Sequence, residues 1–108
     1  MEQWIVIKTT ADKKETLAVI AKTLVAERLC GCAQISGPID SHYRWNEQLE
    51  HSEEYELSIK TAGVLFTTVA ARIKSLHSYE VPQIIAMPIT QISSDYEAWL
   101  RGNLELPK

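Results

Sequence analysis

Apolar residues recur at helical spacing in two stretches of the chain. The first stretch predicts a helix over about residues 13–29, with one apolar face of Leu17, Ile20, Ala21, Leu24, Val25 and Leu29. Asp12 followed by Glu15 is typical of a capping box at its start, and Gly31 is expected to end it. The second stretch predicts a helix over about residues 64–77, with an apolar face of Leu65, Phe66, Val69, Ile73 and Leu76.

Other stretches have the patterns of β-strands. The consecutive apolar residues 4–7 predict a central strand that is buried on both faces. A second strand begins near residue 32 and is broken or bent at Gly37-Pro38. The last apolar strand is expected over residues 84–92, where Pro88 favours a sheet edge or a bulge.

Strict alternation in the middle of the chain predicts a long antiparallel hairpin. Residues 39–45 alternate in character, residues 54–60 mirror that alternation, and the polar residues 46–52 join the two. We expect opposite charges to face one another across this hairpin and to help set its register. The expected pairs join His42 and Arg44 to Glu54 and Glu56.

These elements follow one another in the order β-α-β-β-α-β, and Ser94-Asp95 would cap a short C-terminal helix. The order predicts an α+β, ferredoxin-like fold, with two helices on one face of an antiparallel sheet and a single domain over residues 1–108. The hairpin is long relative to the first strand and should project beyond the sheet. Its aromatic residues and open edges are typical of a subunit interface, so we expect a homo-oligomer.

Composition and charge narrow the classes of partner. The chain has 108 residues, and 45% of them are apolar, as in one ordinary globular domain. Its 11 Lys and Arg against 14 Asp and Glu leave a net charge of -3, which argues against a nucleic-acid partner. No apolar run approaches the roughly 20 residues of a membrane span. Two cysteines one residue apart make no disulfide framework, so we expect a reducing, cytoplasmic compartment.

Two segments combine side chains that can do chemistry. Cys30 and Cys32 could chelate one copper(I) or zinc ion, although two small buried hydrophobic residues are the favoured interpretation. In the loop after the second helix, His77 and Glu80 could coordinate a divalent ion or exchange a proton, and Tyr79 could hydrogen-bond a ligand. A purely structural role for this loop, with His77 closing the helix, stays equally open.

The remaining polar residues do not form a recognisable catalytic group. Lys60, at the end of a strand, could meet an anion, although a solvated lysine is the simpler interpretation. The sequence has neither a glycine-rich phosphate loop nor a nucleophile with an adjacent base. We therefore expect no enzymatic activity.

Three segments are similar to signature segments of one known family. They are residues 28–35 (RLCGCAQI), residues 41–45 (SHYRW) and residues 77–85 (HSYEVPQII). Together with Lys60-Thr61 and the late pair Tyr96 and Trp99, they give the chain a resemblance to the CutA divalent-cation tolerance proteins over nearly its whole length. Ser78 stands where the family usually has proline, which leaves that loop less constrained.

The resemblance implies a ferredoxin-like domain assembled as a homotrimer, similar to the PII signalling proteins. It also implies a role in tolerance to divalent cations, especially copper, with no cofactor required. By position in the family, the metal ligands would be Cys32, His77 and Glu80.

The same resemblance places Lys60, Tyr43 and Trp45 at the clefts between subunits and Tyr79 in the loop signature, and these four are the expected ligand-binding residues. This placement suggests an alternative function from a different class, a PII-like signalling trimer. In that alternative, a small anionic ligand would bind near Lys60 and Tyr79 and would alter contacts with a partner protein.

Overall fold

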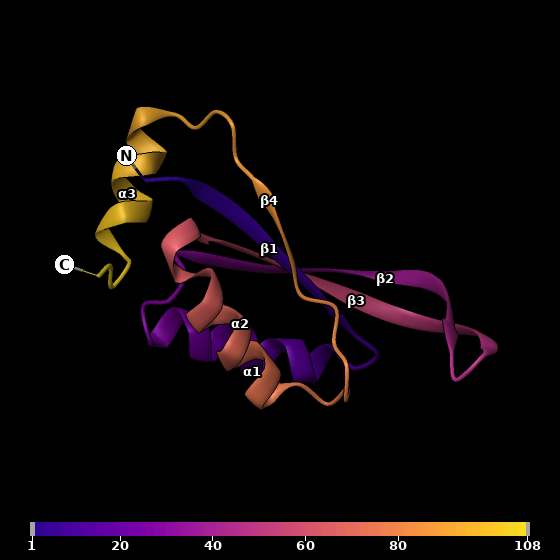
Figure 1. Cartoon of the computed structure of the whole chain (residues 1–108). Coiled ribbons are helices and arrows are strands. Elements are labelled where there is room, and N and C mark those ends of the chain that lie inside the picture. The colour runs from indigo at the N-terminus through magenta and orange to yellow at the C-terminus, as the bar shows by residue number, and fades with distance from the viewer. Residues whose placement is uncertain (1, 108) are drawn as a thin grey trace.

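The computed structural model describes residues 2–107, which form one four-stranded antiparallel sheet with two helices packed on one face (Figure 1). The strands are β1 (Trp4–Ala11), β2 (Cys32–Trp45), β3 (Gln48–Ala62) and β4 (Ile85–Pro88), in the sheet order β2-β3-β1-β4. The helices are α1 (Lys14–Ala26), α2 (Phe66–Leu76), preceded by the 3-10 turn η1 (Gly63–Leu65), and α3 (Ser94–Gly102). This arrangement is the ferredoxin-like α+β fold predicted from the pattern of the sequence.

The core lies between the sheet and helices α1 and α2. Strand β1 is central, and both of its faces contribute buried side chains, as its unbroken apolar run predicts. The helices contribute the buried residues of the two predicted apolar faces, Leu17, Ile20, Leu24, Val69 and Ile73. Strand β4 lies at a sheet edge, as the proline at its end favours.

Several element ends differ from the prediction. Helix α1 ends at Ala26, because Arg28 adopts a left-handed backbone conformation with φ of 60° and breaks the helix before Gly31. Its N-cap is Lys13, without a side-chain cap, so the predicted capping box is absent from this end. Helix α3 is capped one residue earlier than expected, since the Ser93 hydroxyl accepts a hydrogen bond from the Tyr96 amide.

Strand β4 is shorter than the predicted residues 84–92. It pairs with β1 only over residues 85–88, and one further hydrogen bond joins the Ile89 amide to the Trp4 carbonyl. The chain then leaves the edge of the sheet and turns toward α3 (Figure 1). The apolar pattern continues beyond the strand because Ile89 and Ile92 pack against the core from the connecting segment.

The hairpin of β2 and β3 projects beyond the rest of the sheet, as predicted (Figure 1). Strand β1 pairs with β3 only from Tyr55 to Ala62, so residues 48–54 of β3 pair only with β2 among the described residues. At about 3.3 Å per residue, these seven residues extend roughly 20 Å past the end of β1. The pairing shifts register between Ser36 and Ile39, where Gly37-Pro38 interrupts the ladder as the sequence indicated.

The predicted cross-strand charge pairs are wrong. The two strands are joined by Asn46 and Glu47 alone, instead of by the polar stretch 46–52, and this short turn moves the register. His42 consequently lies opposite His51, and Arg44 lies opposite Leu49. Glu56 pairs instead with Lys8 of β1, at 3.0 Å.

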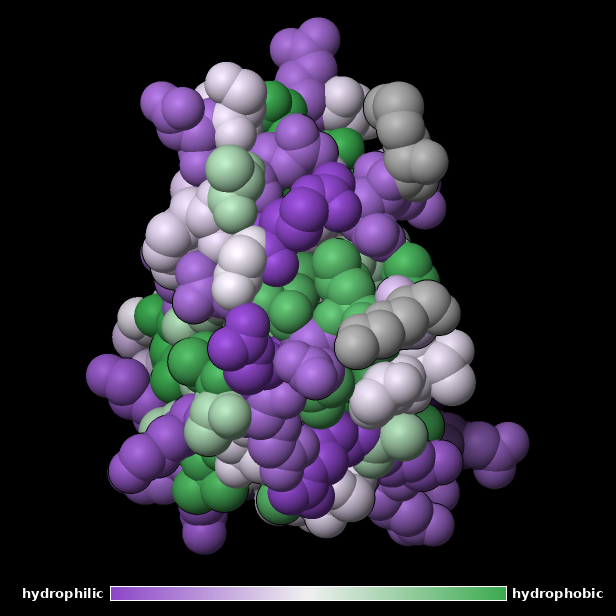
Figure 2. Space-filling model, turned by 90° about the vertical axis from the view of Figure 1, so that its left-hand side faces the viewer, coloured by the Kyte–Doolittle hydropathy of each residue, from purple (hydrophilic) through white to green (hydrophobic). Residues whose placement is uncertain are grey.

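Apolar side chains also reach the surface away from the hairpin. Figure 2 shows the end of the molecule that carries α3 and the N-terminus of β1. A group of hydrophobic residues lies near its centre, surrounded by hydrophilic ones. Exposed apolar surface therefore occurs at this end of the molecule as well as along the projecting hairpin.

Candidate functional site

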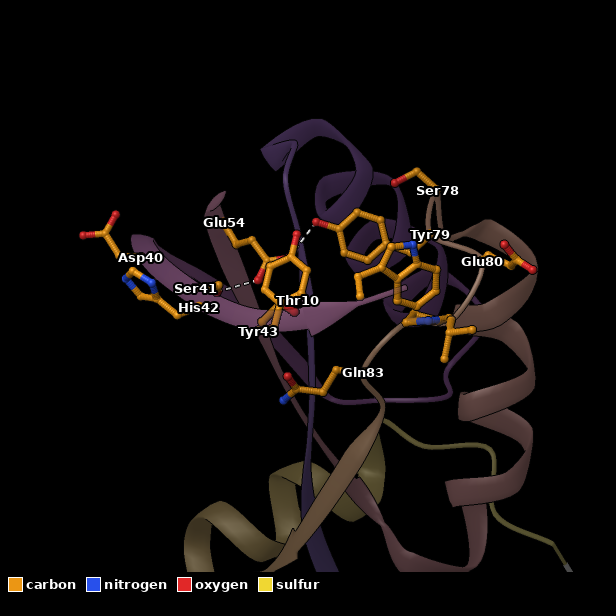
Figure 3. Close-up of a pocket in the computed structure, with 13 residues that line it drawn as sticks. Thr10, Asp40, Ser41, His42, Tyr43, Glu54, Ser78, Tyr79, Glu80 and Gln83 are labelled. Carbon is orange, nitrogen blue, oxygen red and sulfur yellow. Dashed lines mark hydrogen bonds between the residues drawn. The ribbon is translucent and has the colours of Figure 1, made fainter. Parts of the chain in front are cut away.

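A large pocket lies where the projecting hairpin meets the loop that follows α2 (Figure 3). Its volume is about 880 Å³, within the usual range for small-molecule sites. It is lined by Thr10, Asp40, Ser41, His42, Tyr43, Trp45, Glu54, Ser78, Tyr79, Glu80, Val81, Pro82 and Gln83. The charged groups in this lining are three carboxylates, without a lysine or arginine.

The centre of the pocket is the carboxylate of Glu54, whose residue is only 6% exposed. The Ser41 hydroxyl donates a hydrogen bond to Glu54 Oε1 at 2.6 Å, and the Tyr79 hydroxyl donates one to Oε2 at the same distance (Figure 3). Short bonds from neutral donors to an ionised acceptor belong to the stronger class of hydrogen bond. Burial, and then the bond to Glu54, raise the pKa of the Tyr79 phenol. Tyr79 is therefore held as a neutral donor across the physiological range.

Glu54 was expected only as a charge partner of His42 or Arg44, not as a site residue, and the bulge in β2 explains which residues it meets here. Simple alternation assigned Glu54 to the solvated face of its strand. The alternation of its own strand is kept, but the register shift at Gly37-Pro38 brings Ile39, Ser41 and Tyr43 of β2 onto the face of Glu54. The glycine-proline pair signalled a disruption of the strand, but alternation alone did not indicate which residues would be brought together.

His77 lies beside the pocket with both ring nitrogens hydrogen-bonded. Its Nε2 lies 2.8 Å from the carbonyl oxygen of Thr10, and its Nδ1 accepts a hydrogen bond from the Tyr79 amide at 3.0 Å. Since a carbonyl can only accept, Nε2 carries the proton and Nδ1 presents its lone pair to the amide. In this conformation the imidazole orients the loop, and a metal ion would have to displace one of the two bonds.

The other predicted metal ligands lie apart from His77. Across the sheet, Cys32 of β2 is aligned through Lys60 of β3 with Val6 of β1. His77 contacts β1 at Thr10, four residues further along that strand. This register separates the two by about 13 Å along the sheet, in addition to the distance across the strands. Glu80 is exposed on the far side of the pocket from Glu54 (Figure 3). Within residues 2–107, no three His, Cys, Asp or Glu side chains already stand together as a ligand set.

The two cysteines have different surroundings. Cys30 is buried in the core, and burial raises its thiol pKa to about 12. Cys32 is half-buried at the start of β2, next to Tyr96 of α3. Burial and then the Cys32 thiol raise the pKa of the Tyr96 phenol. The interpretation of Cys30 as a small core residue therefore describes its environment well.

Three of the four predicted ligand-binding residues converge. Tyr43, Trp45 and Tyr79 all line the pocket. Lys60 does not line it and donates a hydrogen bond to the Gln34 side chain at 2.7 Å. The lining of the pocket is thus aromatic and acidic, and the lysine expected to meet an anion is hydrogen-bonded to another group.

None of the helices in the described part of the chain combines the length and apolar character needed to cross a bilayer.

Comparison with known proteins gives a consistent result along the chain. Residues 5–103 match the family model described as "CutA1 divalent ion tolerance protein". A protein of Thermus thermophilus named "Divalent-cation tolerance protein CutA" is 39% identical over 98 residues, which are 91% of this chain and 95% of that protein. "Protein CutA, chloroplastic" of Arabidopsis thaliana is 33% identical over 99 residues, which cover 92% of this chain and 54% of the plant protein.

The fold comparison agrees with the sequence comparison. A solved structure of the divalent cation tolerance protein Cut A1 of Thermus thermophilus superposes with a TM-score of 0.89 at 38% identity. The match covers 97% of this chain and 100% of the other.

Proposed function

The chain belongs to the CutA1 divalent ion tolerance family, and we propose that it acts in that tolerance as a non-enzymatic homotrimer that binds divalent cations, copper among them. We further propose that it works in the cytoplasm. The chloroplastic name of the plant relative shows that membership of the family does not by itself specify a compartment.

The charge of the pocket is the observation that best supports cation binding. Asp40, Glu54 and Glu80 contribute carboxylates to its lining, and no lysine or arginine opposes them. Such a lining attracts cations and raises their local concentration. Carboxylate oxygens are ligands for hard divalent ions, and an imidazole nearby would extend the choice to copper and zinc.

We propose Glu80 and His77 as the pair that first contacts the ion. Glu80 is exposed at the rim, and the Nδ1 lone pair of His77 becomes available if the Tyr79 amide releases it. The distance along the sheet keeps Cys32 of the same chain away from this pair. Cys32 would therefore join the ligand set only from another subunit.

Trimer formation is supported by the surface that the single chain leaves open. Within residues 2–107, no third strand pairs with residues 39–54 at the outer end of the hairpin. Tyr43, Trp45 and Leu49 are 43%, 45% and 79% exposed there. Unpaired strand edges with apolar side chains are liabilities for a monomer and normal at a subunit interface. A homotrimer would cover them.

The second candidate function is a PII-like signalling trimer that binds a small molecule. The observation in its favour is a pocket of small-molecule size with three aromatic residues, Tyr43, Trp45 and Tyr79. Its carboxylates favour a cationic or donor-rich ligand over the anionic one first expected. Thermal unfolding with a panel of polyamines, nucleotides and carboxylates tests this candidate, because a specific ligand must stabilise the folded state.

Native mass spectrometry with and without stoichiometric copper(II) tests the leading proposal. We expect a trimer that takes up ions, with weaker uptake in Glu80→Gln and in His77→Gln. Glu105→Gln is the matched control, because that glutamate is exposed near the C-terminus and outside the pocket. A trimer that remains free of copper, zinc and magnesium would contradict direct binding, and a monomer would contradict the proposed assembly.

A further inference from the structure

Two histidines face each other across the projecting hairpin, outside the loop discussed above. His42 of β2 lies directly opposite His51 of β3, and their rings are stacked with centroids 4.3 Å apart and planes 7° from parallel. Two residues along each strand, Asp40 lies opposite Glu53. Because directly opposite residues and residues two apart share one face of a sheet, these four side chains form a block of two imidazoles and two carboxylates.

The block is open to solvent in the single chain, and its one polar contact among residues 2–107 is long. The side chains of His51 and Asp40 are 57% and 76% exposed. The His51 Nε2 and Asp40 Oδ1 atoms are 3.4 Å apart, which is long for a hydrogen bond between them. Exposed side chains of this kind exchange rotamers in nanoseconds or less. The imidazoles can therefore turn toward a ligand without unfolding the hairpin.

The cross-strand placement of the two histidines suits chelation of one ion. A tetrahedral zinc ion holds its nitrogen ligands at about 2.0–2.1 Å, which places two such nitrogens about 3.3 Å apart. The ring centroids are 4.3 Å apart and the planes are nearly parallel, so the in-plane lone pairs do not meet at one point in the stacked arrangement. Rotation of both side chains turns one nitrogen of each ring toward a shared ion. The strands themselves already hold the two histidines opposite each other.

We propose that His42 and His51 chelate one divalent transition-metal ion across the hairpin. Asp40 or Glu53 and water would complete the coordination. Two imidazoles select copper(II), zinc(II) or nickel(II) over magnesium or calcium, and copper(II) binds most tightly among them. No third ligand is yet in place among the described residues, so the metal itself would draw one of the carboxylates in. This site deepens the proposed cation-binding function, on which its biological meaning rests.

The hairpin site differs from the loop site in the state of its histidines. The chain has three histidines, and both ring nitrogens of His77 are already hydrogen-bonded to the backbone. His42 and His51 have only the long contact to Asp40 among their ring nitrogens in the described residues. A metal ion therefore displaces less at the hairpin than at the loop.

The site is tested by titrating the full-length protein with copper(II), zinc(II) and magnesium(II) in a non-chelating buffer. Calorimetry measures the affinity for each metal, and electron paramagnetic resonance identifies the ligands of bound copper. We expect the copper spectrum to show two equivalent nitrogen ligands. Loss of a residue that only orients a metal ligand typically weakens metal affinity 10- to 100-fold. Loss of a ligand itself, in His42→Gln or His51→Gln, should therefore weaken the affinity for copper at least about tenfold.

Two controls separate the hairpin site from the loop. His77→Gln should retain the hairpin ion and its two-nitrogen spectrum. Arg44→Gln changes a neighbour on the same face without removing a ligand, and should bind copper at least as well as the unmodified chain. Far-UV circular dichroism checks that each variant keeps its fold, and native mass spectrometry checks that it keeps its assembly.

The possible results separate this inference from the proposed function. Unchanged uptake in both His42→Gln and His51→Gln overturns the hairpin site, whatever happens at the loop. Uptake lost only in His77→Gln overturns the hairpin site and leaves the proposed function standing. Uptake lost only in the hairpin variants supports the inference and removes the loop as the binding site. An unmodified chain that binds none of the three metals overturns both.

Discussion

Replacing Tyr79 by phenylalanine should destabilise the protein measurably, because it removes one of the two hydroxyls that bind the buried Glu54 carboxylate. The bond lost is 2.6 Å long, and the Glu54 residue is 6% exposed. Hydrogen bonds to charged groups contribute about 1.5–3 kcal/mol. The pocket is open enough for water to replace part of this interaction, so we expect a loss of about 1–2 kcal/mol at pH 7.

The same substitution has a predicted pH dependence. The pKa of Tyr79 is raised in the folded protein, so its contribution to stability is complete below the unfolded value of about 10. Above that pH, the unfolded chain releases the phenolic proton while the folded chain retains it, and stability falls. Tyr79→Phe lacks this proton. The difference in unfolding free energy between the two proteins should therefore shrink above pH 10, by up to about 1.4 kcal/mol per pH unit.

Urea unfolding at a fixed protein concentration, from pH 7 to pH 11, measures both effects. Tyr43→Phe is the matched control, since the Tyr43 hydroxyl is exposed and lies 3.3 Å from Ser52 Oγ. Its removal should change stability by less than about 0.5 kcal/mol. Equal losses in the two variants would show that the bond to Glu54 does not stabilise the fold. A difference that stays constant above pH 10 would show that Tyr79 titrates normally.

Three further predictions test the surroundings of the site. Thiol labelling at pH 8 should modify Cys32 and spare Cys30, because a pKa of about 12 leaves only about one Cys30 thiol in ten thousand ionised. Rapid labelling of a Cys32→Ser variant would contradict this prediction. Glu47→Gly should raise the midpoint of thermal unfolding, because Glu47 has a φ of 64°, a conformation that glycine adopts without strain. A lower midpoint in the variant would contradict this reasoning. Arg72 hydrogen-bonds Glu27 and lowers its pKa, so Glu27→Gln should lower the unfolding midpoint at neutral pH. The deficit should shrink as the pH falls through the lowered Glu27 pKa, and a deficit that does not change with pH would show a cause other than charge.

The fold could be predicted from the sequence because the residues that face the core are apolar and recur at the spacing of helices and strands. The faces of α1 and α2 and the unbroken run of β1 are each explained by the core they form together. The ends of the elements could not be predicted equally well. Helix α1 ends where Arg28 takes a left-handed conformation, which an arginine does not signal.

The site was only partly predictable, because it joins parts of the chain that spacing along the sequence does not relate. Tyr43, Trp45 and Tyr79 could be selected as candidates, and they do meet in the pocket. Glu54 was missed as a site residue because the bulge in β2 changes which β2 residues lie opposite it. Lys60 was expected nearby but is bonded to Gln34 on a different part of the sheet.

The clearest limit of pattern analysis lies in the turn of the hairpin. Alternation shows that two strands exist, but their register depends on how many residues join them. Asn46 and Glu47 form a two-residue turn with φ of 50° and 64°, the left-handed pair of a type I′ turn, without the glycine that usually marks one. With the longer polar connection that the composition favoured, His42 would face a different residue of β3. The contact between His42 and His51 therefore follows from the backbone conformation at two positions. An insertion of one residue into this turn should shift the register and abolish copper chelation while leaving both histidines in the chain.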